Sequence, residues 1–221
     1  MRPRLRIADL LVLLMILLPF LYLQVAYKGL PEVVPTHFNI AGKPNGYSKR
    51  PFLWAILGIT SGISILLFLL MRFLPVIDPK KKAAYSPGIF NKIAVAVVLL
   101  FCCINCLIIL AAQKGSFTFS GALPFLMGLF FAFMGNIMHS IKPNYFAGIR
   151  TPWTLESEET WRKTHQFGGK LWFAGGIVIA VTSLFIPAAL ANYVLLGFGL
   201  ILGLVPVVYS YIYFKSIQKN K

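Results

Sequence analysis

Six long apolar runs, almost free of charged residues, constrain this chain more than any other feature. A helical run of about 20 apolar residues matches the hydrocarbon thickness of a bilayer, and a backbone in lipid must satisfy its own hydrogen bonds. We therefore expect an all-α, polytopic membrane protein with six transmembrane helices. The runs cover Ile7–Tyr27, Phe52–Leu74, Ile93–Ala112, Phe119–Ile141, Leu171–Ala189 and Val194–Phe214.

Composition agrees with this fold class. Of the 221 residues, 58% are apolar and only 12% are charged, whereas about a quarter of the residues of a soluble domain are charged. A soluble globule could not bury so much apolar surface. These values exclude a soluble enzyme and a disordered regulator.

The three cysteines, Cys102, Cys103 and Cys106, all lie in one apolar run. Cysteines confined to a predicted span do not form a disulfide framework, and a metal site needs more ligands than this run offers. We interpret them as packing residues and expect no metal and no cofactor. Asn105, beside them, is predicted to form a hydrogen bond to a neighbouring helix.

Basic residues set the predicted orientation. The net charge is +15, and sixteen of the 21 basic residues fall on one side of the six runs while five fall on the other. Because cytoplasmic loops carry the excess of Lys and Arg, both termini and the 142–170 loop are predicted to be cytoplasmic and the 28–51 loop extracellular. Topology therefore explains the charge, and we expect no direct binding of nucleic acid. The larger set is Arg2, Arg4, Arg6, Arg72, Lys80, Lys81, Lys82, Lys92, Lys142, Arg150, Arg162, Lys163, Lys170, Lys215, Lys219 and Lys221.

The first run begins after basic residues, as a signal peptide does, but no A-x-A-like cleavage site follows it. It is interpreted as a retained signal-anchor helix. Asp9, near its start, is expected to reach the lipid headgroups. No internal repeat is visible along the chain.

Small residues four apart indicate close helix packing. Gly58 with Gly62, and Gly199 with Gly203, form G-x-x-x-G pairs, and Gly175–Ala180 extends the pattern. We interpret these positions as packing sites within the bundle, with a homodimer through one of them as the alternative.

The 28–51 loop is longer than a hairpin connection requires. Lys43–Gly46 reads Lys-Pro-Asn-Gly, a good β-turn sequence, and Thr36–Ile40 before it favours a short strand. The loop is therefore predicted to be a small ordered cap. His37 has no second metal ligand nearby and is interpreted as a structural or surface histidine.

The stretch from Gly135 to Lys170 carries the most information. Asn136, His139 and Ser140 are spaced to share one helix face, which we expect to line the bundle or a water-filled vestibule. A short helix is predicted from Leu155 to Gln166, capped by Thr154 or Ser157 and ended by Gly168-Gly169.

Aromatic residues of this stretch, Trp153, Trp161 and Phe167, are expected at the membrane interface. Three glutamates gather at the start of the predicted helix, where the helix dipole favours negative charge; they are Glu156, Glu158 and Glu159.

These glutamates, with His139 and His165, do not match the spacing of a metal or hydrolase signature. The chain is therefore not predicted to be an enzyme; a docking surface is favoured for the loop, and structural closure is the alternative. Arg150 is predicted to pair with Glu156 or Glu158, with a lipid phosphate as its other possible partner.

Two segments resemble known families. Gly148–Leu155, which reads GIRTPWTL, with Gly168-Gly169-Lys170 closing the stretch, resembles the SdpI family of bacterial immunity membrane proteins. The segment PTHFNIAGKPNGY, from Pro35 to Tyr47, resembles the small N-terminal domain of unknown function that often precedes this module.

The resemblance implies a multi-pass protein of the bacterial plasma membrane that acts in toxin resistance and signalling. It further implies protection against a secreted peptide toxin outside, and a small DNA-binding autorepressor held at the membrane inside. We divide the chain into an N-terminal two-helix region, 1–85, and an SdpI-like four-helix region, 86–221. A membrane transporter or efflux component is the alternative; the lack of ionisable residues deep in the spans is against it.

The candidate residues form two groups. The cytoplasmic group is Asn136, His139, Arg150, Thr151, Pro152, Trp153, Glu158, Glu159 and Trp161. The extracellular, ligand-contacting group is His37, Phe38, Asn39, Gly42 and Gly46.

Overall fold

The computed structural model describes residues 7–77, 87–115 and 121–219, and these form seven α-helices, one short 3₁₀ turn and one two-stranded sheet. Some residues used above lie outside this part of the chain, namely Arg2, Arg4, Arg6, Lys80, Lys81, Lys82, Phe119 and Lys221. The elements are α1 (Ile7–Ala26), the 3₁₀ turn (Tyr27–Gly29), β1 (Val33–Phe38), β2 (Pro44–Lys49), α2 (Phe52–Ile77), α3 (Pro87–Lys114), α4 (Ala122–Met138), α5 (Pro152–Glu156), α6 (Glu158–Ser183) and α7 (Ala188–Lys219).

The predicted helical class is confirmed for the described residues. Four segments, namely Ile7–Gly29, Phe52–Leu74, Gly88–Lys114 and Ala188–Lys219, are long and apolar enough to cross a membrane. Helix α4 is apolar but shorter. Helix α6 is long but carries a polar first half, so its apolar part starts only near Leu171.

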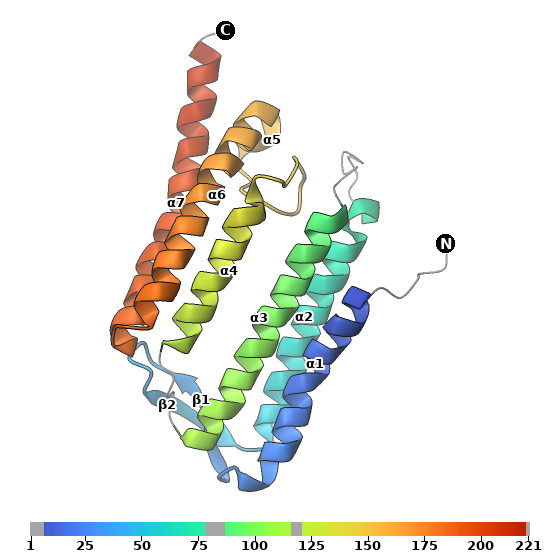
Figure 1. The fold of residues 1–221 in the computed structure, drawn as a ribbon, viewed down its shortest axis with the longest axis vertical. Coiled ribbons are helices and arrows are strands. Elements are labelled where there is room, and N and C mark those ends of the chain that lie inside the picture. The colour runs from blue at the N-terminus through green and yellow to red at the C-terminus, as the bar shows by residue number, and fades with distance from the viewer. Residues whose placement is uncertain (1–6, 78–86, 116–120, 220–221) are drawn as a thin grey trace.

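The helices stand side by side in two lobes (Figure 1). Helices α1, α2 and α3 form the first lobe, and α4, α6 and α7 form the second. The β1–β2 hairpin, residues 33–49, lies at one end of the molecule, here called the hairpin end. The 139–157 segment lies at the other end, here called the loop end, where α1 begins and α7 finishes.

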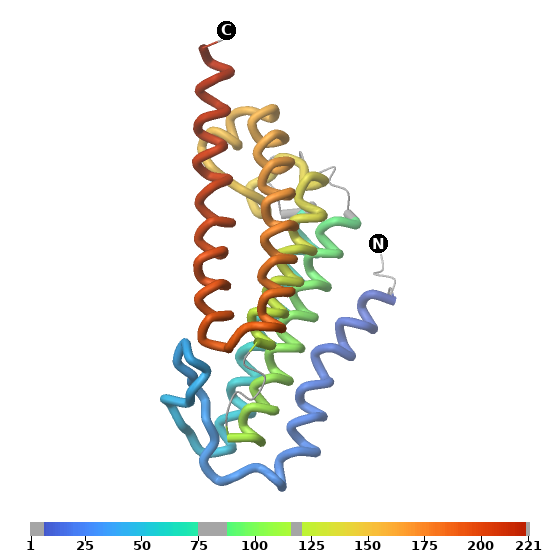
Figure 2. The backbone as a smooth tube through the Cα atoms, turned by 60° about the vertical axis from the view of Figure 1, so that its left-hand side comes forward, coloured from blue at the N-terminus to red at the C-terminus, as the bar shows by residue number. Residues whose placement is uncertain are grey.

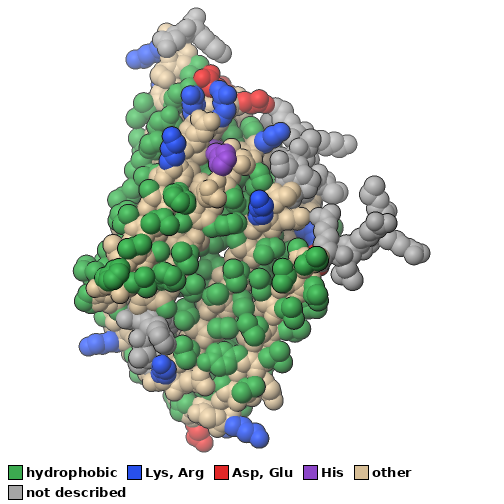
Figure 3. Space-filling view, viewed as in Figure 1, with side chains coloured by type: hydrophobic (Ala, Val, Ile, Leu, Met, Phe, Trp, Pro, Cys, Tyr) green, Lys and Arg blue, Asp and Glu red, His purple; other side chains and the backbone are tan. Residues whose placement is uncertain are grey.

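Surface composition follows the same axis. Hydrophobic side chains cover the middle of the face in Figure 3, and charged side chains gather towards its two ends. Leucines and isoleucines are exposed on α1, α2 and α7. A helix side that faces lipid gains nothing from polar residues, so these apolar side chains suit a position in the bilayer. This distribution is that of a membrane protein.

The first lobe is closed by apolar contacts and two polar links. Leu23, Leu57 and Ile109 are fully buried between α1, α2 and α3. Asn105 accepts a hydrogen bond from the Thr60 hydroxyl at 2.7 Å, so the predicted interhelical contact of this asparagine is confirmed. In this membrane setting a buried amide needs such a partner.

Asp9, which the sequence predicted to reach the lipid headgroups, has a partner within the protein. Its carboxylate pairs with the guanidinium of Arg72 on α2 through two hydrogen bonds. Both side chains are mostly buried, and the pair fastens the start of α1 to the far end of α2. A carboxylate with an arginine within reach keeps its charge satisfied without the headgroups.

The second lobe is joined by an exceptionally close contact between α4 and α6. A Cβ added at Gly128 would lie 2.7 Å from the carbonyl oxygen of Gly176, and one at Gly169 would lie 2.8 Å from that of Gly135. These distances leave no room for a side chain, so the two backbones touch directly. The packing predicted for Gly176 is confirmed: it lies against Gly128 and Ala132, and Gly169 lies against Gly135.

The other glycine pairs were assigned wrongly. A Cβ at Gly58, Gly62, Gly199 or Gly203 would meet nothing within 4 Å in the described structure. These glycines lie on outward sides of α2 and α7 and do not pack within the bundle. The spacing was right for a contact, but spacing does not say which side of a helix has a neighbour.

The predicted fifth span, Leu171–Ala189, is wrong at its C-terminal end, and the helix that contains most of it begins thirteen residues earlier than Leu171. Helix α6 starts at Glu158 and stops at Ser183, and a turn over residues 184–187 leads into α7. The predicted separate helix Leu155–Gln166 is replaced by a five-residue helix, α5, and the first half of α6. Gly168-Gly169 does not end a helix because both glycines are buried within α6, Gly169 directly against α4.

Candidate functional site

The 139–157 segment is an ordered strap over the start of α6. Asn144 is buried at its first turn, and its amide nitrogen donates to the carbonyls of Lys142 and Ala147, both at 2.9 Å. The amide oxygen of Asn144 accepts from the backbone N–H groups of Phe146 and Ala147. One side chain thus satisfies four backbone groups, and it was not singled out from the sequence.

The strap is fixed to α6 by a stacked pair, Trp161 and His165, whose ring centroids lie 4.1 Å apart. The Trp161 indole N–H donates to the carbonyl of Ile141 at 2.7 Å. The His165 Nδ1 donates to the carbonyl of Trp161 at 2.8 Å, and its Nε2 accepts from the N–H of Ile149 at 3.0 Å. These two contacts require the neutral imidazole with its proton on Nδ1.

Burial lowers the pKa of His165 from 6.5 to about 4, and its hydrogen bond to the Trp161 carbonyl opposes the shift. The interface position predicted for Trp161 is wrong, because its side chain is 1% exposed. Trp161 therefore supports the strap from beneath and cannot itself contact a partner. His165, considered from the sequence only as an acid–base group, is a structural residue of the strap.

The GIRTPWTL segment is now explained position by position. Gly148 has a φ of 112°, and a Cβ there would collide with the His165 ring. Thr151 caps α5, with Pro152 in its first turn, and forms a reciprocal capping box with Thr154. Backbone geometry and capping thus account for the glycine, the two threonines and the proline of this string.

The caps differ in part from the prediction. Ser157 caps α6 by accepting from the N–H of Thr160 at 3.2 Å, as predicted. Thr154 is not an N-cap; it sits inside α5 and donates to the carbonyl of Ile149 at 2.9 Å. The hydroxyls of Thr151 and Ser210 are 3.1 Å apart, which ties the strap to α7.

Exposed side chains of the strap and of the start of α6 form the outward surface of the loop end. Arg150, Pro152, Glu158 and Glu159 are exposed, whereas Trp153 is half-buried with its ring 5.0 Å from that of Tyr211. The Arg150 guanidinium donates to the carbonyl of Tyr145, so it braces the strap through the backbone. Its pairing with Glu156 or Glu158 stays a prediction.

A polar groove opens beside the strap, between the end of α4 and α6. It measures about 580 Å³ and contains Asn136 and His139 from α4 and Gln166 and Lys170 from α6. The common face predicted for Asn136 and His139 is therefore confirmed, whereas Ser140, the third residue of that predicted face, is not part of the groove lining. Amide, imidazole and ammonium groups that converge in this way suit a polar or anionic ligand. The remaining lining residues are Gly135, Gly169 and Phe173.

The hairpin at the opposite end has its turn in a different place from the one predicted. Pro44–Gly46 belongs to β2, and the turn lies at residues 39–43, where Asn39 Oδ1 accepts from the N–H groups of Ala41 and Lys43, both at 3.0 Å. Gly42 has a φ of 74°. An asparagine that folds back on its own backbone outcompetes the Lys-Pro-Asn-Gly sequence.

The candidate residues of the hairpin cluster around one cross-strand pair. His37 lies opposite Gly46, where a Cβ would be 2.9 Å from that of His37. The His37 Nδ1 is 2.5 Å from Asn45 Oδ1. The loop is therefore an ordered cap, as predicted, and His37 is an exposed histidine within it.

The hairpin touches both lobes. Val34 is fully buried against the first lobe, and the carbonyl of Ile40 accepts from Asn192 of α7 at 2.8 Å. The tube view in Figure 2 shows the hairpin beside the start of α7. The two groups of candidate residues thus lie at opposite ends of the molecule.

Both segments whose sequences resemble known families, the GIRTPWTL segment and the hairpin segment, lie within regions that match family models. Residues 140–210 match the SdpI/YfhL protein family, and residues 14–60 match a domain of unknown function, DUF1648. The immunity protein SdpI of Bacillus subtilis (strain 168) is 23% identical over 209 residues, which are 95% of this chain and 97% of that protein. No solved structure matches. The resemblance found in the sequence is confirmed: an SdpI-type module follows a DUF1648 segment, in one chain and in that order.

Proposed function

We propose that this chain is an immunity protein of the bacterial plasma membrane that protects its cell against a secreted peptide toxin. It acts by binding and not by catalysis. All six apolar runs cross the bilayer, with both termini and the loop end in the cytoplasm. The observation that carries the proposal is the similarity to the immunity protein SdpI over nearly the full length of both chains.

The two ends of the molecule support a division of labour. The hairpin, with exposed His37 and Asn39, is the side that meets an extracellular ligand. The strap and its groove, with exposed His139 and Glu159, form the side that meets a cytoplasmic partner, which we propose is a small DNA-binding autorepressor. A ligand at one end changes binding at the other only if it prefers one of two arrangements of the bundle.

Survival tests the immunity role. The chain is expressed in a Bacillus strain that lacks its own SdpI, and the cells are exposed to toxin-producing sister cells. We expect survival to rise with the chain and to remain low with an empty vector. Equal killing with and without a correctly inserted chain would refute the immunity role.

Two histidine variants test the division of labour. His37→Ala changes the hairpin and His139→Ala changes the polar groove, at matched expression. We expect His37→Ala to lower survival, and His139→Ala to lower recruitment of a fluorescent autorepressor to the membrane while survival is kept. If both variants lose both readouts to the same extent, one indivisible site or a transport cycle is the better account.

A further inference from the structure

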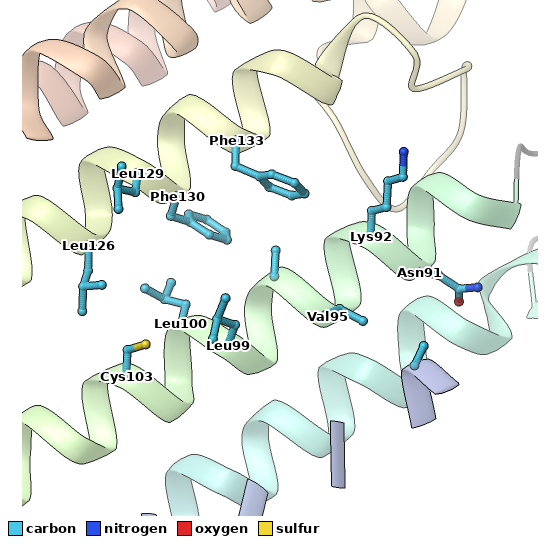
Figure 4. Close-up of a pocket in the computed structure, with 12 residues that line it drawn as sticks. Asn91, Lys92, Val95, Leu99, Leu100, Cys103, Leu126, Leu129, Phe130 and Phe133 are labelled. Atoms are coloured by element: carbon cyan, nitrogen blue, oxygen red, sulfur yellow. The ribbon is translucent and has the colours of Figure 1, made fainter. Parts of the chain in front are cut away.

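An apolar groove of about 540 Å³ runs between the two lobes, along α3 and α4. Figure 4 shows Leu99 of α3 and Leu126, Phe130 and Phe133 of α4 around this groove. On α3 it extends from Asn91 to Cys103, which is about 18 Å of helix. Its volume lies within the range of about 300–1,000 Å³ found for sites that bind small ligands.

The groove persists because the lobes are joined at their ends and not in the middle. At the loop end, Ile93 of α3 packs with Ile137, Ile141 and Trp161 in one buried cluster. At the other end, the hairpin spans the two lobes. Phe131, next to Phe130, turns towards Trp172 of α6 with ring centroids 5.3 Å apart, so it does not fill the groove.

The chemistry of the lining selects hydrocarbon at the centre and an anion at one end. Asn91 and Lys92 are the polar residues of the lining, and no acidic residue is among the described residues that form it. Lys92 is exposed at the loop-end side of the groove, where it points away from the apolar wall (Figure 4). An apolar lining offers water few hydrogen-bond partners, so water is not a suitable occupant.

We propose that the groove binds one acyl chain of an anionic phospholipid, with the lipid phosphate on the Lys92 ammonium. Basic groups between helices on the cytoplasmic side of a membrane are suited to acidic lipid headgroups. The lipid would touch α3 of the first lobe and α4 of the second, so it becomes part of the contact between the two halves. This inference rests on the proposed topology, in which the loop end faces the cytoplasm, and it does not depend on an immunity role.

Native mass spectrometry of the purified, delipidated full chain tests the site. The probes are phosphatidylglycerol, phosphatidylcholine with the same acyl chains, and inorganic phosphate. We expect one phosphatidylglycerol per chain to be retained, phosphatidylcholine to be retained less, and inorganic phosphate not at all. Lys92→Gln should lower retention of phosphatidylglycerol about fivefold, as expected for one lysine near an acidic lipid, while the control Lys219→Gln leaves it unchanged.

A second pair of variants separates the apolar wall from general contact with lipid. Ala96→Phe places a ring in the groove and should lower retention of both phospholipids, whereas Leu200→Phe, on the exposed side of α7, should not. Wild-type chain with phosphatidylglycerol that carries a photoreactive acyl chain locates the site without any variant. We expect cross-links concentrated on residues 91–103 and 126–133 and removed by excess unlabelled lipid. The proposal would be overturned if both phospholipids were retained equally and Lys92→Gln left retention of phosphatidylglycerol unchanged. Cross-links spread equally over α7 would also overturn it.

Discussion

At the scale of single residues, Trp161 and His165 decide how the strap is held. Both side chains are buried, and between them they satisfy the carbonyls of Ile141 and Trp161 and the N–H of Ile149. A neutral imidazole can donate and accept in this way, but an imidazolium can only donate. Protonation of His165 therefore removes its contact with the N–H of Ile149 and weakens the hold on the strap.

The stability of the protein should fall in acid because of His165. Its pKa is about 4 in the folded protein and 6.5 as the ordinary value, so the unfolded chain binds the proton more strongly. The contribution is complete above pH 6.5 and is lost as the pH falls towards 4, a change of roughly 3 kcal/mol in the free energy of unfolding. Thermal unfolding in detergent from pH 7 to 4 measures it.

His165→Gln should flatten this pH dependence, because an uncharged amide replaces the titrating ring. The matched control is His37→Gln, which removes an exposed histidine and should leave the slope in place. An unchanged slope in the His165 variant would assign the acid sensitivity to another group.

Trp161→Phe should destabilise the protein even though the aromatic ring remains. The variant leaves the buried Ile141 carbonyl without the indole N–H that lies 2.7 Å away, and an unsatisfied buried acceptor costs about 1–3 kcal/mol. Trp153→Phe, at a half-buried ring of the same strap, should cost less. Thermal unfolding of the two variants side by side measures the difference, and equal midpoints would contradict the role given to the indole N–H.

At the scale of elements, the seam between α4 and α6 holds the second lobe together. Gly128 and Gly135 of α4 meet Gly169 and Gly176 of α6 with their backbones in contact. Small residues produce this closeness, and in lipid it is the main source of attraction between helices, since burial of apolar surface gains little there. The seam also sets the width of the polar groove that contains Asn136 and His139.

A pair of glycine variants tests the seam. Gly176→Ala places a methyl group against the backbone of Ala132 and should cost about 1–3 kcal/mol as overpacking. Gly203→Ala, where the added carbon meets nothing within 4 Å, should be neutral or stabilise α7 by up to about 1 kcal/mol. Unfolding midpoints in one detergent give the comparison; a stable Gly176→Ala protein would mean that the seam can open without loss.

At the scale of the whole molecule, two lobes are linked at both ends and separated in the middle. The hairpin is anchored in the first lobe through Val34 and reaches α7 through Ile40. The strap packs Phe146 against Leu74 of α2 and Phe90 of α3, and it is tied to α7 through Thr151. The contacts between the lobes therefore lie at the hairpin, through α7, and at the loop end, where Ile93 of α3 packs with Ile137 of α4.

The orientation in the membrane is tested by labelling. In a background without Cys102, Cys103 and Cys106, single cysteines are placed at Ala41 in the hairpin turn and at Glu156 in the strap, both exposed. We expect an impermeant maleimide to label Ala41→Cys in intact cells and Glu156→Cys only after the cells are opened, as the basic asymmetry requires. The reverse pattern would invert the topology.

The sequence alone determined the helical class, the positions of most helices and the two family resemblances. These follow from local properties: the length and apolarity of a run, the distribution of basic residues, and strings such as GIRTPWTL whose residue types are required by caps and turns. It also indicated that Asn136 and His139 share a face, because helix periodicity requires it.

Only the tertiary structure decided which sides of the helices meet. Small residues four apart occur at Gly199 and Gly203, where an added Cβ meets nothing within 4 Å, and also at Gly128/Ala132 and Gly176/Ala180, where two backbones touch. Gly168-Gly169 ends no helix because α4 packs against α6 there. Trp161 is buried by the strap, although its sequence context suited the membrane interface. The hairpin turn moved to residues 39–43 because one asparagine side chain completes it. In each case the outcome depends on a partner distant in the chain or on competition between local turns, and residue spacing contains neither.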